Sequence, residues 1–403
     1  HSYNFPNCNE IHEIDLRHVI ERGRSKKHHT EEKEEKGEEE GDNDDIESTE
    51  EETITKKRES NYYPWGFVGN GLWRDVFTCD PREETLVGTT VSSTPPQPPA
   101  VLKIMKSEHK YDVRNINRHR RDALVMERLS SSHHLVPIYG YCAQTVLTQA
   151  ISHTLDDVIY AREHERVKKW SPHGGYKTKP PLESWMGTDE DGELLLTRET
   201  EIGRIKLALG VFRGLVDLHE GVDDSASSTN DEWLPIVHAD LQSKQYLVDA
   251  QTGHVYLNDF NRCRFMTKKD EPANNDGSSI ESCPLYIPSA PGSSRSPEEY
   301  SKGPLSEKLD IYSAGNVLYG IITGERPWNN ERGKHIKEDI QDGKRPQVDV
   351  SIRNAKGTVD AVLTRLLDRV YEHDPEERAS AREIVDELED LLEVELMKTK
   401  KKN

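Results

Sequence analysis

Cysteine is scarce in this 403-residue chain, and hydrophobic residues make up only 33% of it. The five cysteines stand apart, without a C-x-x-C pair, at Cys8, Cys79, Cys142, Cys263 and Cys283. This spacing predicts neither a metal site nor a disulfide framework, and reduced thiols are the simplest expectation. No apolar run is long enough to cross a bilayer, so the sequence predicts no membrane span.

Positive charge is also in short supply, because the formal net charge is −20 at pH 7. Residues 31–60 contain fifteen Asp or Glu and five Lys or Arg, which is a net charge of −10. With almost no aliphatic side chains to bury, this stretch is expected to be disordered, and we assign residues 1–61 to an N-terminal extension that contains it. The acidity argues against a nucleic-acid partner, since phosphate binding requires a basic face.

The two ends of the chain bear on its location. The chain begins with His1 rather than Met, and residues 396–403 form a basic tail. A cytoplasmic location is expected, with membrane anchoring through a missing N-terminal segment as the alternative. The lysines of the tail favour the end of a solvated helix, where cations are stabilising.

Between these ends, a small β-rich half precedes a larger helical half. Periodicity and turn residues predict strands at 65–68, 75–79, 100–105, 135–142 and 145–150, with a helix at 113–129. Further helices are expected at 155–161, around 205–218, and at 310–323, 336–342, 359–371 and 380–397, with a polar insert at about 165–197. This order predicts one α+β domain over residues 62–395, with a smaller part at about 62–149 and a larger one at about 154–395.

Two aspartates, nineteen residues apart, each follow a short β-prone run. Asp240 lies in IVHADLQSKQYLV, and Asp259 lies in VYLNDFN. On loops beside paired strands, one carboxylate can orient a hydroxyl nucleophile while the other holds a divalent cation on a polyphosphate. An isolated His-x-Asp is more often a turn or a cap, so this interpretation depends on companion motifs.

Two companion motifs occur upstream. Gly69 and Gly71 lie in a turn between strands, where the missing Cβ atoms let backbone N–H groups approach phosphates. Val76 follows them, and Lys103 stands in the apolar strand VLKI. A plain β-turn and a solvent-facing lysine are the alternatives, but the order of the motifs favours a phosphate site.

Together these motifs resemble those of eukaryotic protein kinases, in which H-R-D-x-x-x-x-N precedes D-F-G. The resemblance implies a two-lobed fold with ATP between the lobes and a hinge at about 149–153. It implies that Asp240 orients or accepts the acceptor hydroxyl and that Lys103 positions the phosphates. Asp259 and Gln245 would hold Mg²⁺, with Mn²⁺ possible. The nucleotide would be contacted by Gly69, Gly71, Val76, Lys103, Gln149 and Asp259.

The helix before the fourth strand should supply a carboxylate partner for the strand lysine. Family spacing selects Asp122, and Glu127 is the fallback. Met126 then falls where the family places an apolar residue near His238 and Phe260. An aspartate in this position has a shorter reach than the usual glutamate, by ~1.5 Å.

Later motifs extend the resemblance over roughly residues 62–395. The segment RSPEEY resembles A-P-E, DIYSAG resembles D-x-W-S-x-G, and DPEERAS resembles D-P-x-x-R. The resemblance implies an ion pair between Glu298 and Arg378, and Asp310 is well placed as the N-terminal cap of a helix. Kinases of small metabolites, the third interpretation, commonly lack these motifs, which favours a protein substrate.

Several usual invariants are replaced. Without the arginine that Ala239 replaces, control by an activation-loop phosphate is not expected. An active kinase is favoured over a pseudokinase, which would bind nucleotide or nothing and act as a scaffold. The substitutions that motivate the pseudokinase are at Arg74, Asp122, Ala239, Gln245 and Asn261.

The acceptor type rests on residues around the catalytic loop. Ser/Thr kinases usually carry Lys where this chain has Gln242, and tyrosine kinases carry Arg where it has Lys244. Pro291 also resembles the substrate loop of tyrosine kinases. The chain looks closest to the tyrosine-kinase-like branch, many of whose members phosphorylate Ser/Thr, so Ser/Thr is favoured. The expected partners are ATP and an unidentified protein substrate.

Overall fold

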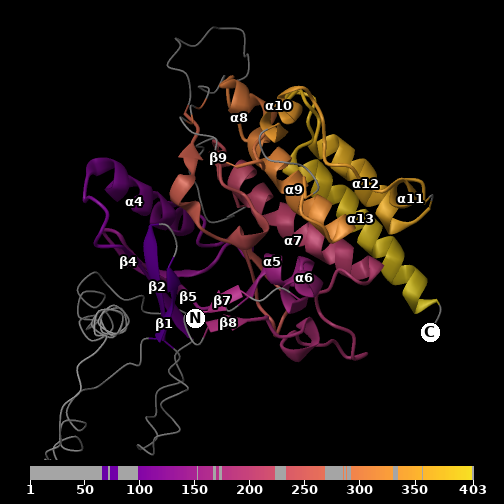
Figure 1. The fold of residues 1–403 in the computed structure, drawn as a ribbon, viewed down its shortest axis with the longest axis horizontal. Helices are drawn as coiled ribbons and strands as arrows, with labels where there is room; N and C mark the ends of the chain where they lie inside the picture. The colour runs from indigo at the N-terminus through magenta and orange to yellow at the C-terminus, as the bar shows by residue number, and fades with distance from the viewer. Residues whose placement is uncertain are drawn as a thin grey trace, which may run out of the picture. The chain divides into compact units, whose positions relative to one another are not determined.

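An antiparallel sheet forms the core of the first of two units into which the chain divides (Figure 1). The strand order is β1-β2-β3-β5-β4. Phe77, Leu102 and Leu147 are buried together on one face of this sheet. Because successive side chains of a strand point to opposite faces, burial of one face produces the apolar alternation that predicted these strands. The strands are β1 (Gly66–Asn70), β2 (Arg74–Cys79), β3 (Ala100–Met105), β4 (Ile138–Cys142) and β5 (Thr145–Gln149).

The computed structural model describes residues 66–70, 73–79, 99–151, 153–166, 169–171, 175–222, 233–267, 285, 287, 292–329, 335–355 and 357–401. The first unit contains the described residues up to Ile116 together with Ile138–Ala150, and the second contains Asn117–Pro137 and the residues from Ile151 onward. The expected N-terminal extension, Gly71, Pro291 and parts of the polar insert lie outside the described residues.

The second unit is mainly helical, and four long helices lie side by side in it (Figure 1). Each of three begins with a side-chain cap on a backbone N–H, from Thr200, Thr358 and Ser380. Almost every residue of the fourth, α9, is buried, so it is the centre of this unit. The four helices are α7 (Glu201–Glu220), α9 (Lys308–Thr323), α12 (Val359–Val370) and α13 (Ala381–Lys400).

Short strands carry the loops that matter for function. β10 (Tyr246–Val248) pairs with both β11 (Val255–Leu257) and β6 (His153–Thr154), and β9 (Ile236–Val237) pairs with β12 (Arg264–Phe265). Helix α7 packs closely on β11: a Cβ at Gly210 would lie 2.7 Å from Val255. Only glycine therefore fits this helix position without a shift of the hairpin.

One more long helix and several short elements complete the described fold. Helix α4 (Val113–Arg128) buries one side, which includes Ala123, Val125 and Met126. The others are α5 (Leu155–Ile159), α6 (Ala161–Arg166), β7 (Lys169–Ser171), β8 (Gly175–Lys177), η2 (Leu182–Ser184), η3 (Ser243–Gln245), η4 (Phe260–Arg262), α8 (Pro297–Ser301), α10 (Ile336–Gln341) and α11 (Val350–Arg353).

The expected α+β fold class is confirmed, and most expected elements are present with shifted ends. The helix expected at 155–161 is two helices, α5 and α6, and the fourth strand begins at Ile138 rather than at 135. Helices α8 and α11 were not expected, because each spans at most five residues, too few for a periodic pattern. Cys142 is disulfide-bonded, so the expectation of reduced thiols is wrong for this residue.

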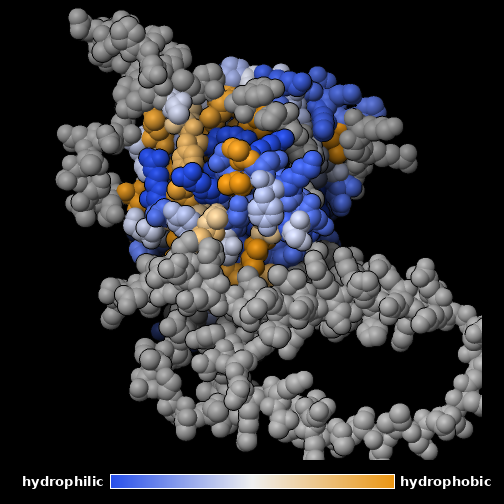
Figure 2. Space-filling view, turned by 90° about the vertical axis from the view of Figure 1, so that its left-hand side faces the viewer, coloured by the Kyte–Doolittle hydropathy of each residue, from blue (hydrophilic) through white to orange (hydrophobic). Residues whose placement is uncertain are grey.

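Among the described helices, none combines the length and the apolar character that a bilayer crossing requires. On the face drawn in Figure 2, hydrophobic and hydrophilic residues are interspersed.

Candidate active site

The loop after β9 carries Asp240, and a buried carboxylate holds its backbone. Ala239 has a left-handed conformation, with φ of 60°, which turns the chain sharply just before Asp240. The N–H groups of His238 and Ala239 donate to the two carboxylate oxygens of Asp310, at 2.6 and 2.8 Å. Asp310 is fully buried, and its Oδ2 also lies 3.3 Å from Nε2 of His219.

The expected role of Asp310 as a helix cap is wrong. Helix α9 begins at Lys308 with Glu307 at its N-cap position, and Asp310 lies inside the first turn. Its side chain leaves its own helix and binds the backbone before Asp240 instead. The sequence did not reveal this contact, because it joins residues 71 and 72 positions apart.

Two arginines approach the carboxylate of Asp240. Nη2 of Arg295 forms an ion pair with Oδ1, and Nε of Arg262 lies 3.9 Å from the same oxygen. Nη1 of Arg295 also donates to the carbonyl oxygen of Ala239 at 2.7 Å. Burial lowers the pKa of Arg262, and the charge of Asp240 opposes this effect. Sequence reasoning missed both arginines as site residues.

The second aspartate lies in a loop whose shape is also unusual. Asp259 has φ of 66° and ψ of 64°, in the left-handed region that few residues adopt readily. Its Oδ1 accepts a hydrogen bond from the side-chain amide of Asn261. The N–H of Phe260 donates to Oδ1 of Asp122 at 2.7 Å, which ties the loop to α4.

The two loops contact each other through aromatic and backbone groups. The rings of His238 and Phe260 meet edge to face, with centroids 5.5 Å apart, and both side chains are fully buried. Nε2 of His238 lies 3.0 Å from the carbonyl oxygen of Asn258. The loops of Asp240 and Asp259 therefore form one packed structure.

The β10–β11 hairpin determines the positions of Gln245, which directly precedes β10, and Asp259, which lies two residues after β11. The N–H of Asn258 donates to the carbonyl oxygen of Gln245 at 2.9 Å, and Tyr246 pairs with Leu257 in the register. This places a side-chain amide and a carboxylate on adjoining backbone segments. Hard oxygen donors of this kind fit Mg²⁺, which takes one or two protein ligands and completes its shell with phosphate oxygens and water.

The residues expected to contact nucleotide lie on the sheet of the first unit. Lys103 is buried on β3, and in the register it faces Val76 on β2 and Val146 on β5. Val76 pairs on its other side with Gly69 of β1. Gln149 ends β5, opposite Ala100.

A second buried contact supports the loop of Asp240 from the other end. Oγ of Ser243 donates to Oδ1 of Asp156 at 2.6 Å. Burial alone would raise the pKa of Asp156, but hydrogen bonds from His164, Arg326 and Ser243 outweigh it and hold this pKa well below its usual range. Asp156 therefore remains ionised and anchors Ser243.

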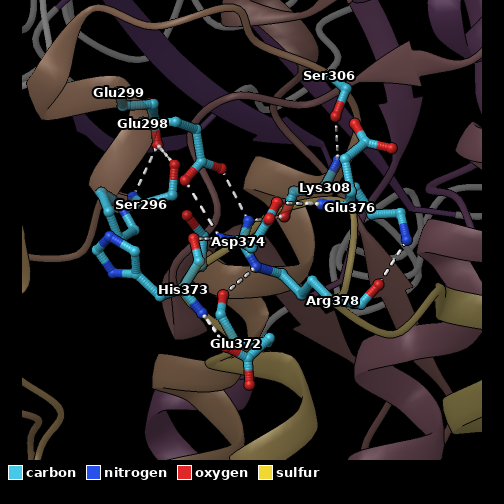
Figure 3. A network of polar contacts seen from close by, with 12 residues as sticks. Ser296, Glu298, Glu299, Ser306, Lys308, Glu372, His373, Asp374, Glu376 and Arg378 are labelled. Atoms are coloured by element: carbon cyan, nitrogen blue, oxygen red, sulfur yellow. Dashed lines mark hydrogen bonds and ion pairs between the residues drawn. The ribbon is translucent and has the colours of Figure 1, made fainter. Parts of the chain in front are cut away.

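The late motifs meet in a polar network (Figure 3). Nη1 and Nη2 of Arg378 donate to Glu298, at 2.7 and 3.2 Å, and the arginine side chain is fully buried. Arg378 also donates to the carbonyl oxygens of Lys308, Glu372 and His373. The network joins α8, the start of α9 and the segment that precedes α13.

Beside this network lies Glu299, which is buried within α8. Burial raises its pKa to about 7, although the charge of Arg295 and the backbone and hydroxyl of Ser296 act in the opposite direction. Its Oε2 accepts from the N–H and the hydroxyl of Ser296, at 3.0 and 3.2 Å, as the N3 residue of a capping box.

A β-sheet unit with a buried strand lysine and a helical unit with two packed aspartate loops define the protein kinase fold. Residues 205–388 match the family model for the protein kinase domain. This match assigns residues 205–388 to the protein kinase domain family.

Known relatives agree with this assignment. The chain is 26% identical over 236 residues to the G-type lectin S-receptor-like serine/threonine-protein kinase SD2-5 of Arabidopsis thaliana, a match that covers 54% of this chain and 25% of the relative. It is 26% identical over 220 residues to phytosulfokine receptor 2 of Arabidopsis thaliana, covering 52% and 19%. It is 30% identical over 164 residues to the receptor-interacting serine/threonine-protein kinase 4 of Mus musculus, covering 40% and 19%. The chain thus spans a quarter or less of the length of these relatives.

Proposed function

We propose that this chain is an active protein kinase that transfers the γ-phosphate of ATP to a serine or threonine hydroxyl, with Mg²⁺. The proposal depends mainly on the contacts that fix the position of Asp240. Asp310 holds the backbone of the two residues before Asp240, Arg295 holds one of its carboxylate oxygens, and its loop packs on that of Asp259. Catalysis of phosphoryl transfer is mostly positioning and charge neutralisation, so a well-supported carboxylate is what this reaction needs.

Each residue then has a role. Asp240 orients the acceptor hydroxyl and takes its proton. Asp259 and Gln245 would hold Mg²⁺, which would neutralise phosphate charge, and Lys103 would contact the α- and β-phosphates. The described residues contain no cluster of three or more His, Cys, Asp or Glu side chains suited to a metal.

Serine or threonine is the proposed acceptor because the relatives' names include serine/threonine kinases. The proposed location is cytoplasmic. The receptor-like names of several relatives favour membrane attachment within a longer protein as the alternative.

The test is phosphorylation of a peptide array by the wild type and by Asp240→Asn. Asparagine keeps an oxygen for Arg295 but cannot take a proton, so we expect transfer to fall about 100-fold or more. Asp390→Asn, an exposed substitution on α13, is the matched control and should leave transfer unchanged. Parallel reactions with Mg²⁺, Mn²⁺ and EDTA test the metal. Equal transfer by wild type and Asp240→Asn would contradict the proposal.

A pseudokinase scaffold is the second candidate, and one contact favours it. The amide of Asn261 occupies Oδ1 of Asp259, an oxygen that the metal would otherwise use. A thermal shift with ATP and no phosphate transfer would identify this function. In Asn261→Gly that contact is absent, so a gain of transfer in this variant would show that the amide competes with the metal.

A further inference from the structure

The charged group closest to the carboxylate of Asp240 does not come from its own loop. Gln242 and Lys244, two and four residues after it, have exposed side chains. In the described part of the chain, neither forms a hydrogen bond or an ion pair with Asp240. The nearest cation is instead Arg295, which lies 55 residues later, just before α8, and Arg262 is farther away, with Nε 3.9 Å from Oδ1.

Arg295 holds two consecutive residues with one planar group. Nη2 pairs with Oδ1 of Asp240, and Nη1 donates to the carbonyl oxygen of Ala239 at 2.7 Å. A guanidinium is rigid and presents its donors as a fork, so it fixes the carboxylate relative to the backbone. The left-handed conformation of Ala239 makes this support valuable, because non-glycine residues rarely adopt it.

The two side chains differ in how far they are open to solvent. The side chain of Arg295 is 3% exposed, whereas that of Asp240 is 20% exposed. No hydrogen bond involves Oδ2 of Asp240 in the described structure. A buried guanidinium is costly to leave unpaired, so the ion pair is a permanent part of the fold rather than a contact that a substrate displaces.

We propose that Arg295 is the positioning residue for Asp240, and this inference rests on the proposed kinase function. Arg295 anchors Oδ1, and Oδ2 faces the acceptor hydroxyl. In the transfer, the acceptor oxygen forms a bond to the γ-phosphorus as the bond from that phosphorus to the ADP oxygen breaks. The hydroxyl proton passes to Oδ2 of Asp240. The segment before α8 thereby supplies the cation that Gln242 does not.

The experiment compares Arg295→Met and Arg295→Lys with the wild type in steady-state kinetics. Methionine has a similar length but no charge, so we expect kcat to fall about 10–100-fold while KM for ATP stays within about twofold. Lysine keeps the charge but not the fork and should lie between the two. Arg365→Met, which removes an exposed arginine on α12, controls for net charge and should match the wild type.

A compensating variant separates positioning from a general structural role. In Arg295→Met/Gln242→Lys, a lysine beside Asp240 replaces the lost cation, and kcat should recover at least threefold over Arg295→Met. Circular dichroism and thermal unfolding check the fold of each variant. If Arg295→Met does not fold, Arg295→Lys with and without Gln242→Lys gives the same comparison.

The outcomes distinguish the inference from the function on which it rests. A wild type that transfers phosphate while Arg295→Met and Arg295→Lys match its kcat overturns the inference alone. A folded Arg295→Met with a higher kcat than the wild type also overturns it, since Arg295 would then restrain Asp240. If the wild type transfers no phosphate, both the proposed function and the inference are wrong.

Discussion

At the scale of single residues, the site depends on buried carboxylates that do no chemistry. Asp310 receives three donors, from the backbone of His238 and Ala239 and from the ring of His219. Ionised acceptors make stronger hydrogen bonds than neutral ones, and a donor left unpaired in the interior is costly. Asp310 therefore determines the shape of the loop that carries Asp240.

Asp310→Asn tests this role. The amide nitrogen of asparagine must face at least one of the three donors, so a repulsive contact replaces a hydrogen bond. We expect the free energy of unfolding to fall by about 3 kcal/mol, and phosphate transfer to fall with it. Urea denaturation measures the loss. Asp386→Asn, an exposed substitution on α13, should change stability by less than about 0.5 kcal/mol, and a similar small change for Asp310→Asn would refute the role.

The sequence singled out the candidate residues that lie in contiguous motifs. Asp240, Asp259 and Arg378 are each marked by their neighbours in the chain. Arg295 and Arg262 were missed, because their contact with Asp240 depends on how distant loops pack and leaves no local pattern. Arg295 stood inside a recognised motif, but nothing in that motif indicates where its side chain points.

At the scale of elements, helices and strands were predicted correctly where the periodic pattern of apolar residues extends over many positions. The strand at 100–105 and the helices at 310–323 and 359–371 were placed to within two residues, because each buries a continuous face or core. Short elements such as α8 were missed. Helix α8 exists because Pro297 starts it, a Ser296–Glu299 capping box holds its first turn, and Arg378 binds Glu298 within it.

The ion pair between Glu298 and Arg378 should therefore be a stabilising contact between elements. Arg378→Met leaves Glu298 without its partner, and we expect a loss of about 3–5 kcal/mol of unfolding free energy. Glu298→Gln keeps an acceptor and should cost less. A double-mutant cycle should give a coupling of about 1–3 kcal/mol.

An exposed ion pair provides the control for this cycle. Arg353 and Asp368 form two hydrogen bonds, but both side chains are more than 40% exposed. Solvent screens such pairs, so Arg353→Met should cost less than about 1 kcal/mol. Equal losses for Arg353→Met and Arg378→Met would mean that burial does not strengthen the Glu298 pair.

At the scale of the whole molecule, several buried groups titrate with opposite effects on stability. Burial raises the pKa of Glu299 to about 7, and burial lowers the pKa of His134 to about 4, with nearby positive charges acting in the same direction. Burial also lowers the pKa of His153. The folded state thus prefers the uncharged form of each group.

The signs of the two pH effects follow from these directions. Between about pH 4.5 and 7 the folded state binds a proton at Glu299 that the unfolded state releases, so this group destabilises the fold as pH rises, by at most about 3 kcal/mol. Between about pH 6.5 and 4 the unfolded state binds a proton at His134 that the folded state does not, so this group destabilises the fold as pH falls. The partial exposure of His134 reduces its effect.

We therefore expect the wild type to have a shallow stability profile from pH 4.5 to 7.5, because opposing slopes partly cancel. Glu299→Gln removes one slope, so its unfolding free energy should rise with pH across this range. His134→Gln removes the other, so its unfolding free energy should fall more steeply with pH than that of the wild type. Urea denaturation at four pH values measures the profiles, with Glu393→Gln on the exposed side of α13 as the matched control. A Glu299→Gln profile parallel to that of the wild type would show that Glu299 is already ionised in the fold, and that its burial is compensated by Arg295 and Ser296.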